Sequence, residues 1–279
     1  MKIVYLIKRI LSNVKKLWFN RFIEHRDDGK FSISRERNNR IIVLTAAYNC
    51  EKYIGKCLTT ISKQKYNNFK CFVMDDISID KTFEIAKNFE NKDKRFTVIK
   101  NSKKHYPVGN YDQIINGNHG IRDDDIIVEV NGDDWLPDNE TLDRIALEFL
   151  DRSVWFANGS FIYADGRKGF TKKPEDFSRI RESEFTASHI RAYKAFLWKN
   201  ILSEDLRDEE GNYWSKAGDL AFGFPMLEMC GASHYKFMKE INYIYNDENP
   251  INEHKVGINE VNIIVNKIRS KKAYKPLIN

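Results

Sequence analysis

Two pairs of adjacent carboxylates each follow an apolar run of this 279-residue chain. Asp75 and Asp76 follow one run directly, and Asp133 and Asp134 come shortly after a second run, 126–130. Such runs are typical of buried strands in a parallel sheet, and open α/β sheets bind ligands at the carboxyl ends of these strands. Adjacent carboxylates repel each other unless a cation or polar ligand lies between them. One pair alone could be an ordinary polar turn, but two pairs ending two strands favour a divalent metal, Mn²⁺ or Mg²⁺, that carries a diphosphate.

Hydrophobic periodicity indicates the elements that must position these carboxylates. Apolar runs predict strands, spacing of about 3.6 residues predicts helices, and the two alternate along the chain. The predicted strands are 41–46, 71–74, 96–99 and 126–130, and the predicted helices are 53–61, a segment from Thr82 with Ser78 or Asp80 as its cap, and 111–121. Strands alternating with helices in this way imply right-handed crossovers and a mostly parallel sheet. Both acidic pairs should therefore lie at one edge of a single sheet.

Three short motifs at these strand ends resemble those of a known enzyme family. They are Ala47-Tyr48-Asn49, then Asp75-Asp76-Ile77-Ser78-Ile79-Asp80, then Asn131-Gly132-Asp133-Asp134-Trp135. In this order they are similar to the motifs of the inverting family-2 glycosyltransferases, over residues 40–165 and more loosely to 255. The resemblance implies the GT-A fold, an α/β architecture with a mostly parallel Rossmann-like sheet flanked by helices and an antiparallel extension on the acceptor side. Asn158-Gly159, interpreted as a hairpin turn between two apolar strands, falls where that extension begins.

The resemblance also implies which residues bind the nucleotide. Ala47, Tyr48 and Asn49 would meet the base, Asp75 and Asp76 the base or ribose, Asp133 the ribose, and Asp134 the metal that bridges the diphosphate. That metal would neutralise the charge that develops on the leaving nucleoside diphosphate. The chain departs from the family pattern where Asn131 replaces an Asp, Ile77 replaces a Gly, and Ala46-Ala47 replaces a stretch in which Pro is frequent. An Asn still accepts a hydrogen bond from a ribose hydroxyl, so we expect the donor site to be kept.

Inverting transfer requires a base that takes the proton from the acceptor hydroxyl. The segment 215–222 resembles the later acidic motif of the family, in which a carboxylate at a helix start is the base, and this implies Asp219 as that base. Glu228, about two helical turns further on, is the second candidate if Pro225 allows the helix to continue. The alternative for Asp219 is an ordinary helix N-cap that follows Gly218.

Two later segments supply further candidate contacts. The polar loop 245–255 resembles the family loop that closes over the diphosphate, which implies that His254 completes the metal shell and Lys255 meets a phosphate. Arg191 precedes an aromatic-rich helix predicted from Tyr193 and is expected to contact a phosphate or the acceptor. A structural salt bridge is the alternative for Arg191, and a solvated side chain is the alternative for His254.

The first residues of the chain have a different character. In residues 1–24, apolar residues that include Trp18 and Phe22 recur at helical spacing with Lys and Arg between them. This basic amphipathic pattern predicts peripheral contact with a membrane surface, and packing on the protein's own domain or on a second subunit is the alternative. We therefore expect an N-terminal helix and linker over 1–39, a catalytic domain over 40–264 and a basic tail over 265–279.

The distribution of charge and cysteine supports this division. Residues 1–40 contain eleven Lys or Arg and four Asp or Glu, so their net charge of +7 exceeds the +6 of the whole chain. The body is therefore mildly acidic, whereas a nucleic-acid binder would carry basic charge on a folded face. Basic termini suit anionic lipid headgroups or a lipid-linked acceptor better. The four cysteines show no metal-binding spacing, which favours reduced thiols and a cytoplasmic protein, peripheral at the cytoplasmic membrane face.

The sequence thus predicts a metal-dependent inverting glycosyltransferase of the hexosyltransferase type. It would transfer a sugar from a nucleotide-diphosphate donor, a UDP-sugar, to a hydroxyl of a saccharide or lipid-linked acceptor in glycan or polysaccharide synthesis. A catalytically inactive nucleotide-sugar-binding or scaffold protein with the same fold is one alternative. Another nucleotide-binding α/β transferase is the second, although residues 45–49 contain none of the glycines of a phosphate-binding loop. Donor sugar, acceptor, linkage and oligomeric state do not follow from the sequence.

Overall fold

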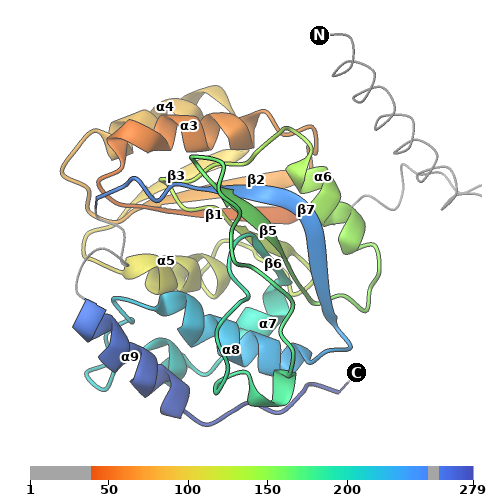
Figure 1. Ribbon diagram of the computed structural model, residues 1–279. Coiled ribbons are helices and arrows are strands. Elements are labelled where there is room, and N and C mark those ends of the chain that lie inside the picture. The colour runs from red at the N-terminus through yellow and green to blue at the C-terminus, as the bar shows by residue number, and fades with distance from the viewer. Residues whose placement is uncertain (1–38, 251–257, 279) are drawn as a thin grey trace, which may run out of the picture. The chain divides into compact units, whose positions relative to one another are not determined.

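Strands and helices alternate along the first half of the chain and become irregular after it. The computed structural model describes residues 39–250 and 258–278 (Figure 1). Its strands are β1 (Ile41–Ala47), β2 (Phe69–Asp75), β3 (Phe96–Lys100), β4 (Ile126–Glu129), β5 (Phe156–Tyr163), β6 (Arg191–Lys194) and β7 (Tyr235–Tyr245). Its α-helices are α3 (Glu51–Ser62), α4 (Thr82–Lys92), α5 (Tyr106–Ile115), α6 (Thr141–Glu148), α7 (Ala195–Lys199), α8 (Gly218–Cys230) and α9 (Ile258–Ser270). The predicted membrane-contacting helix and the residues His254 and Lys255 lie outside the described residues.

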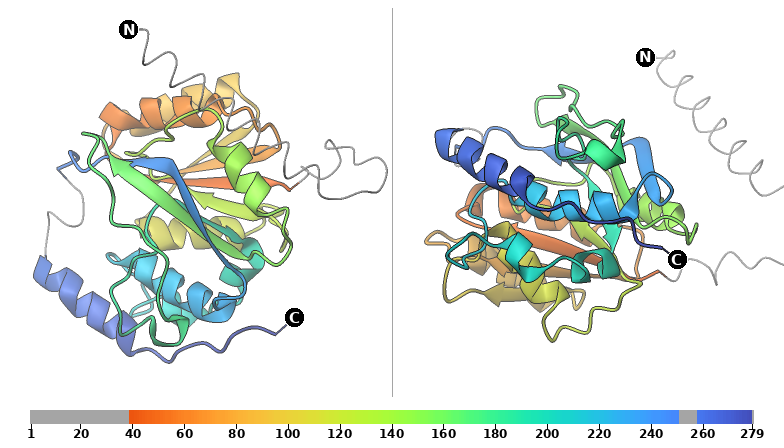
Figure 2. Two further views of the ribbon diagram at one scale, coloured as in Figure 1. Left: turned by 45° about the vertical axis from the view of Figure 1, so that its right-hand side comes forward. Right: turned by 90° about the horizontal axis from the view of Figure 1, so that it is seen from below.

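The described strands form a seven-stranded sheet in the order β3-β2-β1-β4-β6-β5-β7. β3, β2, β1 and β4 are parallel neighbours, as the alternation of strands and helices predicts. β6 is antiparallel to both β4 and β5, and β7 lies parallel to β5. This is the predicted mostly parallel sheet with an antiparallel extension. The left view of Figure 2 shows β5 and β7 side by side at the far edge of the sheet.

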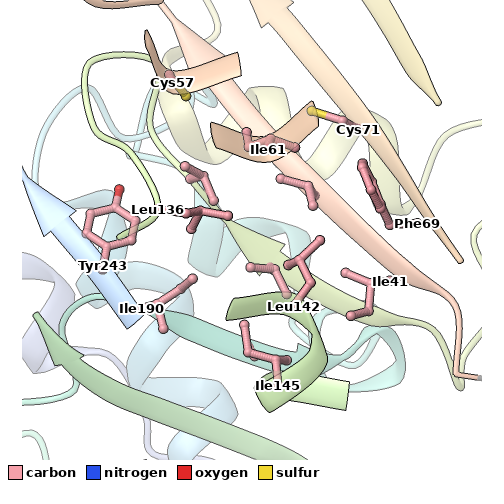
Figure 3. Packing of buried hydrophobic residues seen from close by; sticks show 14 of the residues in the cluster. Ile41, Cys57, Ile61, Phe69, Cys71, Leu136, Leu142, Ile145, Ile190 and Tyr243 are labelled. Carbon is pink, nitrogen blue, oxygen red and sulfur yellow. The ribbon is translucent and has the colours of Figure 1, made fainter. Parts of the chain in front are cut away.

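Each face of the sheet is covered by its own layer of helices, because side chains alternate along a strand. On β1, Ile41 and Val43 pack into the core formed with α3, α4 and α6, whereas Ile42 and Leu44 pack into the core formed with α5, α7 and α8. Figure 1 shows α3 and α4 on one side of the sheet and α5, α7 and α8 on the other, and Figure 3 shows the first core from close by. Burial on both faces explains why the parallel strands are continuous apolar runs.

Three predicted elements differ from the structure, the first of them a turn. The predicted hairpin turn at Asn158-Gly159 is wrong, because both residues lie inside β5, which pairs with β6 on one side and β7 on the other. The strand continues through a bulge near Gly159, whose Cα approaches the Met238 side chain so closely that an added Cβ would lie 3.3 Å from it. Hydrogen-bond partners on both sides thus override the local turn preference of Asn-Gly.

The helix predicted over 111–121 begins and ends earlier, at Tyr106 and Ile115. Pro107 stands in its first turn, a common helix-start signal, and its N-terminal N–H groups are capped from outside the segment, as described below. The aromatic helix predicted from Tyr193 is in fact the strand β6 followed by α7. Helix α9 crosses the predicted boundary at residue 264, and the segment after it runs beside α8, where the Leu277 N–H donates to the Met229 carbonyl at 2.9 Å (Figure 2).

No helix in the described part of the chain is long and apolar enough to cross a lipid bilayer. All four cysteines are buried thiols.

A buried carboxylate, Asp125, connects the segments that precede β1 and β4. Asp125, which is 0% exposed, accepts a 2.9 Å hydrogen bond from Nε of Arg40 and a 2.7 Å hydrogen bond from the backbone N–H of Arg122. Burial alone would raise the pKa of Asp125, but hydrogen bonds and positive charge from Arg40 and Arg122 outweigh it and hold the pKa below its ordinary value. The ends of β1 and β4 are thereby held together.

We predict that Asp125→Asn lowers the free energy of unfolding by about 2 kcal/mol at pH 7, because the partly buried Arg40 guanidinium loses its charge partner. A depressed folded-state pKa contributes stability above the unfolded pKa, so the difference from wild type should narrow as the pH falls below the ordinary Asp value of 3.8. Urea unfolding at pH 7 and pH 3 measures both effects. Asp124→Asn, at a side chain that is 76% exposed, is the matched control and should change little.

Candidate active site

The predicted motifs meet at the carboxyl edge of β1, β2 and β4. The Asp76 N–H donates to the carbonyl of Ala47 at 2.8 Å, and the Gly132 N–H donates to the carbonyl of Ala46 at 3.0 Å. A Cβ at Gly132 would lie 3.0 Å from the Cβ of Ala47 and 3.1 Å from Sγ of Cys50, so a larger residue would have to push these neighbours away. The parallel sheet therefore brings together three motifs that are far apart in the sequence.

Side-chain hydrogen bonds join the loop after β1 to the loop after β2. The Asn49 Oδ1 accepts from the Ile79 N–H at 2.9 Å, and the Ser78 hydroxyl accepts from the Asn49 N–H at 3.0 Å. Asp80 accepts from the N–H of Thr82, as predicted, and also from the N–H of Glu51. Of the predicted base-binding loop, Asn49 is thus occupied in holding the neighbouring loop, and Ala47 is 2% exposed.

Ile77 has a φ of 62°, in the left-handed region that favours glycine. Its position is where the family pattern usually has glycine, so the backbone conformation is kept although the residue type is not. A β-branched residue there is strained, and such strain is stored where the surrounding hydrogen bonds over-determine the loop.

Asp76 caps the loop that leads into α5. Its carboxylate accepts from the N–H groups of His105 and Tyr106 at 2.8 and 2.9 Å and from Nδ2 of Asn101 at 2.9 Å, and its side chain is 3% exposed. These bonds satisfy N–H groups at the start of α5, the cap that the local sequence of α5 lacks.

Lys104, in the loop that Asp76 holds, is a site residue that the motifs and their spacing do not predict. Its Nζ lies 2.8 Å from the centroid of the Tyr48 ring and 3.5 Å from Oδ2 of Asp76. Tyr48 is 41% exposed and is the accessible aromatic ring at the end of β1. Lys104 is notable because it lies between two predicted base-binding groups. This arrangement exists only in the folded chain, so the sequence alone could not indicate it.

Asp75, the last residue of β2, is 0% exposed, and within the described residues neither carboxylate oxygen has a hydrogen-bond partner. Burial raises its pKa. Asp75 thus differs from Asp76, whose carboxylate accepts three N–H hydrogen bonds.

Asp133 and Asp134 have different surroundings. Asp134 is 1% exposed, and its oxygens accept from the Tyr243 hydroxyl and the Asn246 N–H, both at 2.7 Å. Asp133 is partly exposed and accepts from Nδ2 of Asn249 at 2.7 Å. Burial raises the pKa of both carboxyls, and the charge of Asp133 raises that of Asp134 further. A bound cation would relieve this penalty, and Asp133 has the more accessible oxygens.

Asn131 connects this acidic pair to two tyrosine hydroxyls. Its Nδ2 lies 3.4 Å from Oδ2 of Asp134, its Oδ1 accepts from the Tyr111 hydroxyl at 3.2 Å, and its N–H donates to the Tyr243 hydroxyl at 3.1 Å. Figure 3 shows the Tyr243 hydroxyl beyond the apolar core that includes Leu136. An Asp at position 131 would add a third negative charge, so the amide lowers repulsion in the cluster.

Arg191 lies inside the protein and joins two carboxylates. It is 4% exposed, its Nε and Nη2 donate to Oε2 of Glu129 at 2.9 and 2.7 Å, and its Nη1 is 3.6 Å from Oδ2 of Asp219. The salt bridge that was the alternative for Arg191 is therefore present. Asp219 lies in the first turn of α8, after the N-cap Ala217, and its side chain is 40% exposed.

The second candidate base, Glu228, is held at the opposite end of α8. Its two oxygens accept from Nε and Nη2 of Arg181 at 2.6 and 3.0 Å, and one of them also accepts from the Tyr274 N–H at 2.9 Å. The helix continues through Pro225 to Glu228, but the carboxylate anchors the C-terminal segment.

The carboxyl edge of the sheet offers two adjacent carboxylates, Asp133 and Asp134, as candidate metal donors. Within residues 39–250 and 258–278, no three His, Cys, Asp or Glu side chains lie close enough to bind a metal ion by themselves. One or two carboxylates together with substrate phosphates are nevertheless a common set for Mg²⁺, and the acidic pair with raised pKa values fits that chemistry. The predicted contribution of His254 falls outside the described residues.

Comparison with curated proteins gives glycosyltransferases. The chain is 30% identical to glycosyltransferase GlyA of Streptococcus pneumoniae over 190 residues, 62% of this chain and 26% of that protein. It is 33% identical to glycosyltransferase GlyG of the same organism over 162 residues, 57% of this chain and 51% of that protein. The chain thus spans about a quarter and about half of the lengths of these two relatives.

Solved structures with the same fold include TarS residues 1–349 of Staphylococcus aureus in complex with UDP-GlcNAc. Its TM-score is 0.59 at 18% identity, over 82% of this chain and 66% of that one. Glucosyl-3-phosphoglycerate synthase of Mycobacterium tuberculosis, in complex with Mn²⁺, UDP and phosphoglyceric acid, gives 0.58 at 12% identity, over 88% and 84%. These likenesses confirm the predicted GT-A fold.

The sequence profile described as glycosyl transferase family 2 matches residues 42–206, more than half of the chain and all of the strands that carry the acidic pairs. The chain belongs to glycosyl transferase family 2.

Proposed function

We propose that the protein transfers a sugar from a nucleotide-diphosphate donor to a hydroxyl acceptor with inversion. The observation that carries this proposal is the arrangement at the carboxyl edge of the sheet. Tyr48 and the partly exposed Asp133 lie in the loops that follow two parallel strands, and Arg191 links the strand of Glu129 to the exposed carboxylate of Asp219. A nucleotide site and a candidate base are thus fixed to one rigid sheet.

Each residue has a defined part in the proposed reaction. Tyr48 would stack on the base, and Asp75 and Asp76 would line the base or ribose. Asp133 would hold a divalent metal, which would supply charge neutralisation for the leaving diphosphate. Asp134, which the resemblance implies as the metal ligand, accepts from the Asn246 N–H and so holds that loop beside Asp133. Asp219 takes the proton from the acceptor hydroxyl as that oxygen attacks the anomeric carbon, and Arg191 orients Asp219.

A UDP-sugar is the donor we favour. TarS binds UDP-GlcNAc and the mycobacterial synthase binds UDP with Mn²⁺, but a mannosyltransferase of the same fold from Pyrobaculum calidifontis binds GDP-mannose with Mn²⁺, at a TM-score of 0.54. A saccharide or lipid-linked acceptor, a role in polysaccharide synthesis and peripheral membrane contact of residues 1–24 remain part of the proposal. The basic amphipathic sequence of those residues supports the membrane contact.

We predict that one of UDP, GDP and dTDP binds more tightly with Mn²⁺ than with EDTA, and that Asp133→Asn abolishes this difference. The reason is that the accessible carboxylate of Asp133 is the proposed ligand of the metal. Calorimetric titration of wild type and Asp133→Asn with each nucleotide, once with Mn²⁺ and once with EDTA, measures the difference in affinity. UDP is titrated first, because it belongs to the donor we favour.

Asp134→Asn is the informative comparison in the same titration. It should lower the melting temperature, because Tyr243 and Asn246 lose a charged acceptor, but should keep the Mn²⁺ dependence. If the dependence is instead lost only in Asp134→Asn, Asp134 is the ligand, as the sequence predicts. No binding of any nucleotide to wild type with Mn²⁺ present would overturn the donor site and favour the inactive-scaffold alternative.

We predict that Asp219→Asn lowers kcat by about 10²- to 10⁴-fold, the usual contribution of a general base, with the nucleotide affinity unchanged. Release of UDP from a UDP-sugar in the presence of an acceptor panel measures kcat, and calorimetry measures the affinity.

Glu228→Gln is the control for that experiment. It should destabilise the protein, because the Arg181 guanidinium loses its charge partner, and should retain kcat in the folded fraction. A large loss of kcat in Glu228→Gln with Asp219→Asn active would reverse the assignment of the base.

A further inference from the structure

A side chain of the protein itself occupies the space beside the groups that are proposed to bind the base. The ammonium of Lys104 lies 2.8 Å from the centroid of the Tyr48 ring, 3.5 Å from Oδ2 of Asp76 and 3.3 Å from the carbonyl oxygen of Asp76. One ammonium therefore separates the ring face from the carboxylate. A planar base that stacks on this ring face needs the space that the ammonium occupies.

The contact is favourable but displaceable. A cation over an aromatic ring and beside a carboxylate gains modest energy at a partly exposed site, and the Lys104 side chain is 26% exposed. Burial lowers the pKa of Lys104, although the charge of Asp76 opposes this, so the position also carries a desolvation cost. Asp76 does not depend on Lys104, because three N–H donors remain when the lysine leaves.

We propose that Lys104 is an internal competitor that occupies the base site of the free protein and must be displaced before a nucleotide binds. This proposal rests on the proposed function, since it takes the ring face of Tyr48 beside Asp76 as the base site. A protein in which Lys104 has left this site in only a fraction of molecules binds every ligand more weakly by that same fraction. The lysine thus sets the affinity for all nucleotides that stack on Tyr48.

This mechanism differs measurably from a direct contact between Lys104 and the ligand. A competitor weakens all bases equally, so its removal tightens them by one common factor and leaves their affinity ratios unchanged. A lysine that donated to a particular base carbonyl would weaken binding of that base when removed and would change the ratios.

The test is calorimetric titration of uridine, UDP and GDP on the full chain, comparing wild type with Lys104→Met. Methionine keeps the length of the side chain without its charge. We expect every ligand that binds wild type to bind Lys104→Met about 5- to 30-fold more tightly, by the same factor, from loss of the cation–π and ion-pair contacts. Uridine is included because it carries no phosphate, so its affinity does not depend on attraction between the lysine and the diphosphate.

Lys103→Met is the matched control. It removes one positive charge from the same loop at an exposed side chain, and no ring contact or ion pair of Lys103 is found within the described residues. It should leave uridine binding unchanged. An equal gain in Lys103→Met and Lys104→Met would overturn the competitor, because the effect would then come from net charge.

A second measurement follows the contact without any ligand. In protein labelled with ¹³C-lysine, the ε-methylene signal of Lys104, assigned by its loss in Lys104→Met, should lie upfield of other lysines because it is over the Tyr48 ring. Tyr48→Leu should remove this shift, and saturating UDP should move the signal toward the free-lysine position. A signal at the free-lysine position in wild type would overturn the proposal.

The outcomes also separate this proposal from the function on which it rests. If wild type binds a nucleotide and Lys104→Met binds it equally or more weakly, the competitor fails and the donor site stands. If neither protein binds any of the probes, the donor site fails and the competitor with it. Binding by Lys104→Met alone would support both.

Discussion

The buried ion pair between Glu129 and Arg191 connects the two halves of this protein. Glu129 ends β4, the last strand of the parallel part of the sheet, and Arg191 begins β6, the first strand of the antiparallel part. Charges removed from water in this way are tolerated only as a pair, and loss of one partner typically costs about 3–5 kcal/mol. Because Arg191 also reaches Asp219 at the start of α8, the same pair fixes the candidate base relative to the strand that carries the acidic site.

The site is otherwise built from carboxylates that differ in how they are satisfied. Asp76 is surrounded by N–H donors and serves the backbone, whereas Asp75 is buried without such donors in the described structure. Asp134 turns inward to Tyr243 and Asn246, and its neighbour Asp133 is left with the accessible oxygens. Adjacent residues of one type therefore have different chemistry, because their side chains meet different hydrogen-bond partners where the chain leaves the sheet.

Several elements followed from local pattern alone. β1 to β4, α3, α4 and their order were predictable, because strands buried on both faces and amphipathic helices leave clear apolar patterns. The Asn158-Gly159 hairpin was not, because the pairing of β5 with β6 and β7 supplied partners that outweighed the local turn preference. The start of α5 was also missed, since its cap comes from Asp76, thirty residues earlier in the chain.

The sequence by itself determined the fold class, the family and the strand ends at which chemistry-bearing residues gather, because hydrophobic periodicity and short motifs are local properties. Only the tertiary structure decided which of those residues is accessible. In the folded chain Asp134 accepts from the buried Tyr243 hydroxyl, and Lys104 lies over the Tyr48 ring. Arg191 pairs with Glu129, and Glu228 pairs with Arg181. These outcomes depend on contacts between segments far apart in the chain, and burial, hydrogen bonding and charge pairing at such contacts have no local signature.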